Sequence, residues 1–120
     1  CDALEVPVIW HSDGFVEPLI EMALEAGIIG MHALEPLAGN DLGRIKQRFG
    51  ESMVLLGNVD CASVLTTTDL QAVRGEVDRC MAEAKSGGGY LLATSNSLHS
   101  ACTAEAVREM YHYAREVGTY

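Results

Sequence analysis

The sequence lacks the features that mark membrane, secreted or nucleic-acid-binding proteins. It has 8 Lys and Arg against 17 Asp and Glu among its 120 residues, a formal net charge of −9, and such a chain repels phosphate backbones and anionic membrane surfaces. No apolar run approaches the roughly 18 residues of a membrane span, and the first residues lack the basic and apolar regions of a signal peptide. We therefore expect a cytoplasmic protein without a nucleic-acid or membrane partner.

Cysteine pairs and a glycine-rich phosphate loop are also missing. Cys1, Cys61, Cys80 and Cys102 form no C-x-x-C pair, so neither a zinc knuckle nor a disulfide framework is indicated. Cys61 and Cys102 are predicted to be small buried hydrophobic residues. The first apolar run is followed by "HSDG" and not by the G-x-G-x-x-G of a dinucleotide-binding sheet.

Short apolar runs alternate with helical patterns four times along the chain. The runs are Val6–Trp10, Ile28–Leu34, Met53–Leu56 and Tyr90–Ala93. Apolar residues at helical spacing predict helices from Val16 to a C-cap at Gly27, from Asp41 to Phe49, from a capping box at Thr68–Gln71 up to Gly87, and from Ala104 to Val117. No linker divides the chain, so residues 1–120 are predicted to form one domain.

Apolar strands that are each joined to the next by a helix predict a parallel sheet covered by helices. A doubly wound sheet is one solution, and the second is half of an eight-unit (β/α) barrel, because four βα units are present. In both, the residues just past each strand gather at one rim. These residues are His11 and Asp13, Glu35, Asn58 and Asp60, and Ser95, Asn96 and His99.

Four stretches together resemble the C-terminal part of the uroporphyrinogen decarboxylase superfamily. They are "HSDG", "LEPLAGNDLGRIKQRFG", "LLGNVD" and "GGGYLLATSNSLHSACTAEAVREMYHYAREVGTY". The resemblance implies a TIM-type (β/α)8 barrel of roughly three times this length, of which the chain is the second half. Because a half-barrel leaves two strand edges unpaired, we expect a homo-oligomer or a separate N-terminal half to cover them.

The superfamily includes the tetrapyrrole decarboxylase and zinc-dependent methyltransferases that act with corrinoid proteins. The methyltransferase branch has a His-x-Cys after this first strand and a later cysteine, which together bind zinc. This chain has His11-Ser12-Asp13 at the first motif. The resemblance places Asn96 where the methyltransferases have the later cysteine and where the decarboxylase has a histidine.

A metal site is predicted at His11, Asp13 and Glu35, whose imidazole and carboxylates would supply three of the usual four zinc ligands. Carboxylate in place of thiolate makes the site harder, so manganese, iron or no metal remain alternatives. In the metal-free alternative, Asp13 caps the following helix and His11 is a hydrogen-bonded residue of the rim.

Three residues are candidates for acid–base chemistry. Glu35 is predicted to be a general base or ligand, or else to order its loop. Asp60 is a catalytic candidate whose alternative is a cap for the segment that follows. His99 is a candidate proton donor whose alternative is an exposed loop histidine.

The remaining candidates concern ligand binding. Asn58, Ser95 and Asn96 are predicted to contact the cofactor or substrate, with the two asparagines as hydrogen-bond donors that orient a ligand. His32 alternates with Met31 in its strand, which favours packing over ligation.

The resemblance favours a metal-assisted methyltransferase that takes a small-molecule substrate and acts with a corrinoid carried by a partner protein. The methyl group would pass from a methoxylated or methylamine-type donor to the corrinoid protein. In the other direction, it would pass from the corrinoid to a thiol. The first alternative is a porphyrinogen decarboxylase, which needs no metal and grips substrate carboxylates with basic residues. The second is an inactive half-barrel.

Overall fold

The computed structural model describes residues 5–119. Strands and helices alternate along the chain in the order β1 (Ile9–His11), α1 (Ile20–Glu25), β2 (Gly30–His32), α2 (Leu42–Phe49), β3 (Val54–Val59), α3 (Leu70–Ala84), β4 (Tyr90–Thr94) and α4 (Ala104–Val117). Short 3₁₀ helices at Glu17–Leu19 and Pro36–Ala38 precede α1 and α2. The predicted alternation of strand and helix is therefore confirmed.

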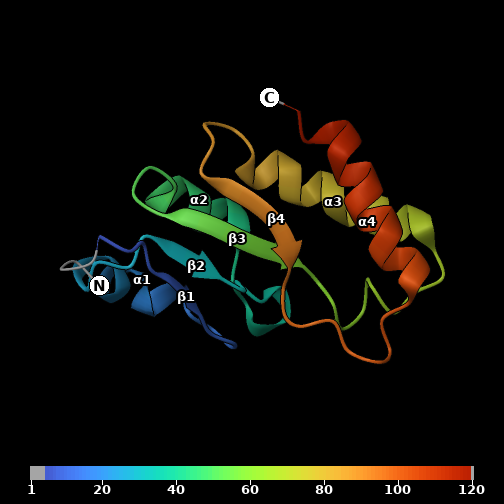
Figure 1. Ribbon diagram of the computed structural model, residues 1–120, viewed down its shortest axis with the longest axis horizontal. Helices are drawn as coiled ribbons and strands as arrows, with labels where there is room; N and C mark the ends of the chain where they lie inside the picture. The colour runs from blue at the N-terminus through green and yellow to red at the C-terminus, as the bar shows by residue number, and fades with distance from the viewer. Residues whose placement is uncertain (1–4, 120) are drawn as a thin grey trace.

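The four strands form one sheet in the order β1-β2-β3-β4, and every neighbouring pair is parallel (Figure 1). The register pairs His11 with His32 at the ends of β1 and β2, and Val59 with Thr94 at the ends of β3 and β4. The loops that follow β2, β3 and β4 consequently gather at one end of the sheet, at the lower right of Figure 1. This end is the predicted rim.

Element boundaries differ from the prediction mainly in the strands. β1 and β2 are shorter than the apolar runs around them, whereas β3 continues to Val59. Asn58 therefore lies inside a strand and not past its end, which corrects the sequence prediction. The helix predicted from Val16 begins as a 3₁₀ helix whose N-cap, Val16, makes no side-chain hydrogen bond. Asp13 is thus not a helix cap.

Side-chain caps begin three of the helices. Asp41 accepts a hydrogen bond from Arg44 N at 2.8 Å at the start of α2, and Thr103 accepts one from Ala106 N at 3.1 Å at the start of α4. At α3 the cap is Asp69, which accepts from Gln71 N at 3.0 Å, and not Thr68 as the capping-box pattern predicts. These bonds satisfy backbone N–H groups that have no partner within their own helix.

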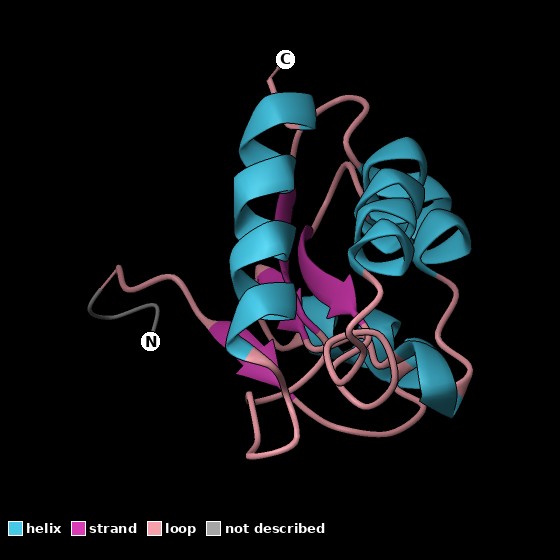
Figure 2. Ribbon diagram, turned by 90° about the vertical axis from the view of Figure 1, so that its right-hand side faces the viewer, coloured by secondary structure: helices cyan, strands magenta, loops and turns pink. Residues whose placement is uncertain are grey.

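The core lies between the sheet and the helices packed on one of its faces. α3 packs on β3 and β4 and contacts both α2 and α4. In Figure 2, α4 is the upright helix that leads to the C-terminus beside the strands. The largest fully buried side chains include Ile20, Met31, Leu55, Val77 and Met110. Burial of this apolar surface supplies the main favourable term in folding.

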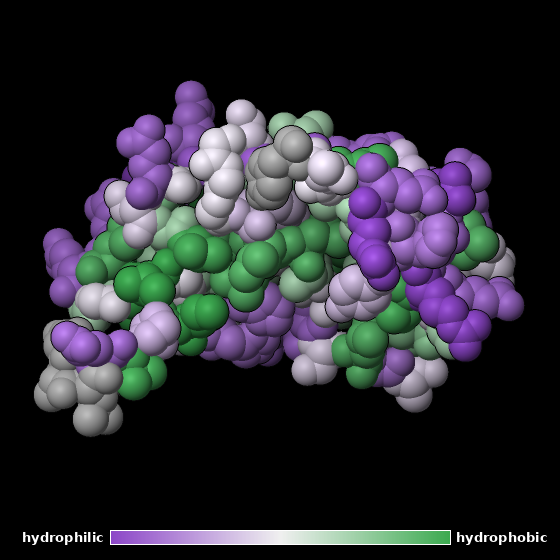
Figure 3. Space-filling model, turned by 45° about the horizontal axis from the view of Figure 1, so that its top comes forward, coloured by the Kyte–Doolittle hydropathy of each residue, from purple (hydrophilic) through white to green (hydrophobic). Residues whose placement is uncertain are grey.

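The edges of the sheet are open within residues 5–119, because neither β1 nor β4 has a further strand beside it. Ile9 on β1 is 52% exposed and Leu91 on β4 is 54% exposed, and hydrophobic surface runs across the face seen in Figure 3. The architecture is therefore part of a (β/α) barrel with four parallel strands. Among the helices of the described residues, none is long and apolar enough to cross a membrane.

Candidate functional site

Four polar side chains that come from three parts of the chain meet at the rim. His11 ends β1 and His32 ends β2, Asp13 follows β1, and Asn96 follows β4. His11 Nδ1 lies 2.6 Å from His32 Nδ1, His11 Nε2 lies 3.5 Å from Asp13 Oδ1, and Asn96 Nδ2 donates to Asp13 Oδ1 at 2.8 Å. The four side chains therefore form one connected chain of polar contacts, which we call the rim cluster.

The two imidazoles come together because of strand register. His11 and His32 are paired positions of neighbouring parallel strands, so their side chains leave the sheet on the same face. His32 Nε2 also lies 3.0 Å from the carbonyl oxygen of Thr94, the last residue of β4. The structure corrects the interpretation of His32 as a packing residue, because both of its ring nitrogens make polar contacts.

The alternation of β2 explains why His32 reaches the rim cluster. Met31 is fully buried, and successive residues of a strand face opposite sides of the sheet, so His32 faces away from the helices. The sequence contains this signal, since the large apolar Met31 marks the core face. What it does not contain is the position of His11 across the strand pair.

Asn40 holds the loops that carry the site, and sequence analysis gave it no role there. It is 4% exposed, and its Nδ2 donates to Gly14 O at 2.8 Å and to Glu35 O at 2.9 Å. Its Oδ1 accepts from Val16 N at 3.0 Å. One buried amide thus fixes the loops after β1 and β2 to each other. No local pattern distinguishes this asparagine, because two of its partners, Gly14 and Val16, are more than twenty residues away in the sequence.

Glu35 lies beside the rim cluster and faces the backbone of the neighbouring loop. Its Oε2 accepts a hydrogen bond from Gly14 N at 3.1 Å, which is the loop-ordering role considered as the alternative. This contact directs the carboxylate to the loop after β1. A catalytic role for Glu35 stays a prediction.

Asn58 and Ser95 lie beneath the rim and not on it. Both are fully buried. Asn58 Nδ2 donates to Leu34 O at 2.8 Å and its Oδ1 accepts from Arg79 Nη2 at 2.9 Å, while Ser95 Oγ accepts from Cys61 N at 3.3 Å. In this structure they order the chain, which differs from the ligand contacts predicted for them.

Asp60 and His99 order the loops that follow β3 and β4. Asp60 Oδ1 accepts from Ala62 N at 2.9 Å and its Oδ2 from Ser63 N at 3.1 Å, so it caps the segment that follows, as the alternative states. His99 Nε2 donates to Cys61 O at 3.2 Å and its Nδ1 accepts from Ala101 N at 3.3 Å. Both ring nitrogens of His99 are thus occupied by backbone groups, and its role as proton donor stays a prediction.

The thiols of the described residues lie in or beside the core. Cys61 and Cys80 are buried and Cys102 is partly buried, and all three are free. Burial raises the pKa of the Cys80 thiol, which keeps it protonated and unreactive. The predicted burial of Cys61 is confirmed. Cys1 lies outside the described residues.

The predicted metal ligands come together only in part. His11 Nε2 and Asp13 Oδ1 are 3.5 Å apart, close to the separation of two ligands on a tetrahedral zinc ion, about 3.3 Å for bonds of about 2.0 to 2.1 Å. Glu35 instead binds Gly14 N, and Asn96 turns an N–H group, which does not ligate, toward Asp13. Between residues 5 and 119, no three His, Cys, Asp or Glu side chains form a group that could hold a metal ion. The described residues therefore do not fit the predicted metal.

The two arginines of α2 form structural ion pairs, and Lys46 of the same helix donates to the carbonyl oxygen of Gly88. Arg44 binds Glu17, which is 8% exposed, with Nη2 to Oε2 at 2.6 Å, and Arg48 binds Glu21 at 3.0 Å. The Arg44 guanidinium holds the pKa of the Glu17 carboxyl below its usual value. These arginines therefore do not supply the substrate grip that the decarboxylase alternative needs.

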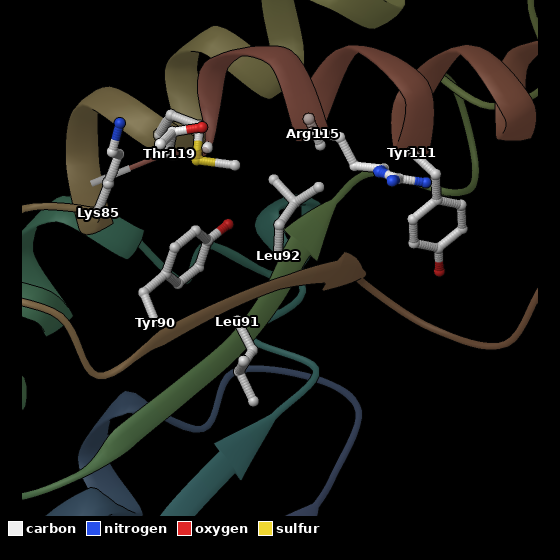
Figure 4. A pocket seen from close by; sticks show the side chains of 10 residues that line it. Lys85, Tyr90, Leu91, Leu92, Tyr111, Arg115 and Thr119 are labelled. Atoms are coloured by element: carbon white, nitrogen blue, oxygen red, sulfur yellow. The ribbon is translucent and has the colours of Figure 1, made fainter.

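A cavity of about 400 Å³ lies away from the rim, at the free edge of β4 (Figure 4). Tyr90 and Leu92 of β4 face it from one side, and Tyr111 and Arg115 of α4 face it from the other. Tyr90 is the first residue of β4, so the cavity lies toward the amino end of the strand. It is therefore separate from the rim cluster.

A comparison with known protein families identifies the family of the chain. A family model described as uroporphyrinogen decarboxylase (URO-D) matches residues 1–117. The chain belongs to the uroporphyrinogen decarboxylase family. The superfamily resemblance noted in the sequence is thereby confirmed. The rim cluster therefore belongs to a chain of this family.

Solved structures include a methyltransferase from Methanosarcina mazei that has the same fold. The TM-score is 0.80 at 19% sequence identity, and the match covers 98% of this chain and 33% of that chain. The chain thus spans about a third of the length of that protein, in agreement with a partial barrel. No curated protein matches the chain.

Proposed function

We propose that the protein containing this family chain transfers methyl groups between a small molecule and a corrinoid carried by a partner protein. The observation that carries the proposal is the rim cluster. It places an imidazole beside a carboxylate at the carboxyl ends of parallel strands, where (β/α) barrels hold their active sites. The likeness of the fold to a methyltransferase supports methyl transfer over other reactions of the family.

The chemistry of such a transfer needs a proton at the leaving atom. When a methoxylated or methylamine-type donor loses its methyl group, the oxygen or nitrogen left behind takes a proton to become a good leaving group. His11 is the candidate proton donor, because its side chain is 49% exposed and its Nε2 lies at the rim near Asp13. The corrinoid would supply the cobalt centre that accepts the methyl group.

The divalent metal expected from the sequence is not part of this proposal, because His11, Asp13 and Glu35 do not converge on one point. A proton from His11 replaces the Lewis acid that the metal-assisted mechanism would use. Asp13 would orient the His11 ring and stabilise its charged form. Asn96 donates to the same carboxylate oxygen and keeps it in place.

The test is a methyl-transfer assay on the complete protein that contains this chain. The assay uses reduced cobalamin as the probe for the acceptor, with methoxylated aromatics and methylamines as donors. We expect methylcobalamin to form, and His11→Gln to lower the rate at least about 100-fold, the lower range for loss of a general acid.

The matched control is His112→Gln on the exposed surface of α4, which should leave the rate unchanged because the His112 side chain is 75% exposed. An unchanged rate in His11→Gln would overturn the proposal. So would the release of carbon dioxide from a carboxylated porphyrinogen without any methyl transfer, which would favour the decarboxylase.

A further inference from the structure

The sheet is curved like half of a closed barrel. His32 Nε2 on β2 lies 3.0 Å from the carbonyl oxygen of Thr94 on β4, although β3 separates these two strands. Asn96 and Asp13 join the loops after the two outer strands through a hydrogen bond of 2.8 Å. Such contacts need a sheet that bends toward one face. Four strands bent in this way form half of an eight-stranded barrel.

The two open edges of the sheet can pair with each other when they come from different copies of the chain. β1 and β4 run in the same direction, because every neighbouring pair of strands is parallel. Within the described part of the chain, neither has a strand on its outer side, so each leaves a row of backbone N–H and C=O groups available. β1 of one copy can therefore extend β4 of another copy as a parallel strand. Because four strands span half a barrel, the same contact made twice closes the ring.

The β4 edge has a cavity, and the β1 edge has apolar side chains that fit it. α4 packs on α3, and a cavity of about 400 Å³ lies between α4 and Leu92 of β4 (Figure 4). At the other edge, Trp10 of β1 and Met22 of α1 border a smaller apolar hollow, and Met22 is 64% exposed. Trp10 pairs in register with the fully buried Met31, so it points to the helix-covered face of the sheet. Beside β4 of another copy, Trp10 and Met22 would therefore lie beneath α4.

The two edges also carry opposite charges. The guanidinium groups of Arg108 and Arg115 on α4 are in none of the hydrogen bonds or ion pairs between described residues, whereas the four other arginines all bind acidic side chains. On the β1 side, α1 exposes Glu21 and Glu25. α4 of one copy would lie next to α1 of the other, because neighbouring helices of a barrel cover neighbouring strands. This complementarity favours the contact in a chain whose net charge of −9 otherwise opposes self-association.

We propose that two copies of this chain close one eight-stranded parallel barrel, in which β1 of each copy pairs with β4 of the other. Trp10 and Met22 of one copy fill the cavity beneath α4 of the other, and Glu25 lies beside Arg115 of the other copy. The rim clusters of both copies then surround one barrel mouth from opposite sides, so each copy supplies the missing wall of the other's site. The proposal concerns assembly and does not depend on the proposed methyl transfer.

The mass of the 120-residue chain in solution gives the first test. Sedimentation and light scattering should give twice the 12.9 kDa of one chain and no larger species, because a closed ring leaves no edge free. Trp10 is the one tryptophan of the sequence, so its fluorescence reports the contact. Dilution below the dissociation constant should shift the emission to longer wavelength as Trp10 becomes exposed to water.

Two charge reversals test which edges meet. Glu25→Arg and Arg115→Glu each place like charges at both contacts of the dimer, so each variant alone should raise the dissociation constant at least about tenfold. An equimolar mixture of the two variants should restore the dimer. In the mixed dimer, one contact joins the two reversed residues and the other contact joins two native ones.

Glu51→Arg is the matched control. It changes the net charge by the same amount as Glu25→Arg, at an exposed position that precedes the inner strand β3, so it should leave the dimer intact. Circular dichroism of each variant checks that the fold is retained, as expected for substitutions of exposed side chains.

Three results would overturn the proposal. The first is a native chain that stays monomeric at micromolar concentration. The second is a mass above that of the dimer, which would indicate an open series of contacts instead of a closed ring. The third is a pair of charge reversals without effect, or a mixture that dissociates as readily as the single variants, which would show that α1 and α4 do not face each other. Because no substrate is present, these outcomes are independent of the methyl-transfer assay.

Discussion

Asn96 donates a hydrogen bond of 2.8 Å to Asp13, although the two residues are 83 positions apart in the sequence. The bond connects the loop after β4 to the loop after β1. These two strands, β1 and β4, form the two edges of the sheet. It therefore crosses the open side of the partial barrel at the level of the rim cluster. A carboxylate held in this way keeps His11 beside a fixed negative charge.

Gly57 is predicted to tolerate no side chain. Its φ is +138°, and a Cβ atom would lie 2.4 Å from the carbonyl oxygen of Ala33, so Gly57→Ala forces β2 and β3 apart. We expect a loss of stability of about 3 kcal/mol or more, the range of severe overpacking and backbone strain. Urea denaturation followed by circular dichroism measures it.

The matched control for Gly57 is Gly75 in the exposed part of α3, where an added Cβ meets nothing within 4 Å. Gly75→Ala should raise stability by up to about 1 kcal/mol, because alanine is the better helix former. Equal effects of the two substitutions would contradict the close approach of β2 and β3.

The ion pair of Glu17 and Arg44 should make stability depend on pH. Because Arg44 lowers the pKa of Glu17 in the folded chain, the pair stabilises the fold above the unfolded value of about 4.3, and this contribution is lost as the pH falls through the lowered pKa. Glu17→Gln should therefore reduce the urea midpoint at pH 7 and differ less from the native chain at pH 3. Glu21→Gln is the control, because Glu21 is 69% exposed and should have little effect at either pH.

Asn58 is predicted to act on stability and not on ligand affinity. Its replacement by Ala removes the donor to Leu34 O and one of the acceptors of Arg79 Nη2, which keeps Glu76, and opens a small cavity, at a cost of about 2 to 4 kcal/mol. Thermal unfolding of Asn58→Ala measures this cost. A folded variant that loses substrate affinity without losing stability would restore Asn58 as a binding residue.

The local sequence determines the ends of some elements well. α4 runs from Ala104 to Val117 as predicted, because its cap, Thr103, and its apolar spacing lie within the segment itself. The sequence prediction placed Asn58 past the end of its strand, and this was wrong for the opposite reason. Its burial depends on Arg79 of α3, whose guanidinium binds its side chain, and a polar residue with such a distant partner looks like a loop residue.

The candidate site was predictable as a place and less so as a set of partners. His11 and Asp13 were found because they follow a strand, and all parallel strands end at the same rim. The contact of His11 with His32 depends on the register of β1 and β2. The position of Asn40 depends on two atoms of the loop after β1 and on one atom of its own loop. Neither relationship is encoded by spacing along the chain.

Self-association of the 120-residue chain stays a prediction of the open sheet edges. Light scattering should give a mass above the 12.9 kDa of one chain, because Ile9 and Leu91 leave apolar surface exposed on the two edge strands. Leu91→Lys should shift the chain toward the monomer, whereas Lys at Gln47, an exposed position of α2, should not. A monodisperse native monomer at micromolar concentration would contradict this expectation.

The rim cluster should gain a metal site when two of its oxygen and nitrogen groups become thiols. His11 Nε2 is 3.5 Å from Asp13, and Asn96 is 2.8 Å from Asp13, so Asp13→Cys with Asn96→Cys would place two thiolates near one imidazole. Zinc binds such a set far better than the present one, because thiolate is a strong ligand and an amide N–H is none. We expect about one zinc per chain by inductively coupled plasma mass spectrometry after reconstitution, against a substoichiometric amount in the native chain.

Asp13→Cys alone, which supplies one thiolate, should bind more weakly, and His11→Gln in the double variant should reduce the binding again. Stoichiometric zinc in the native chain that is lost in His11→Gln would show that the present residues do form a metal site, contrary to the geometry of Glu35 and Asn96.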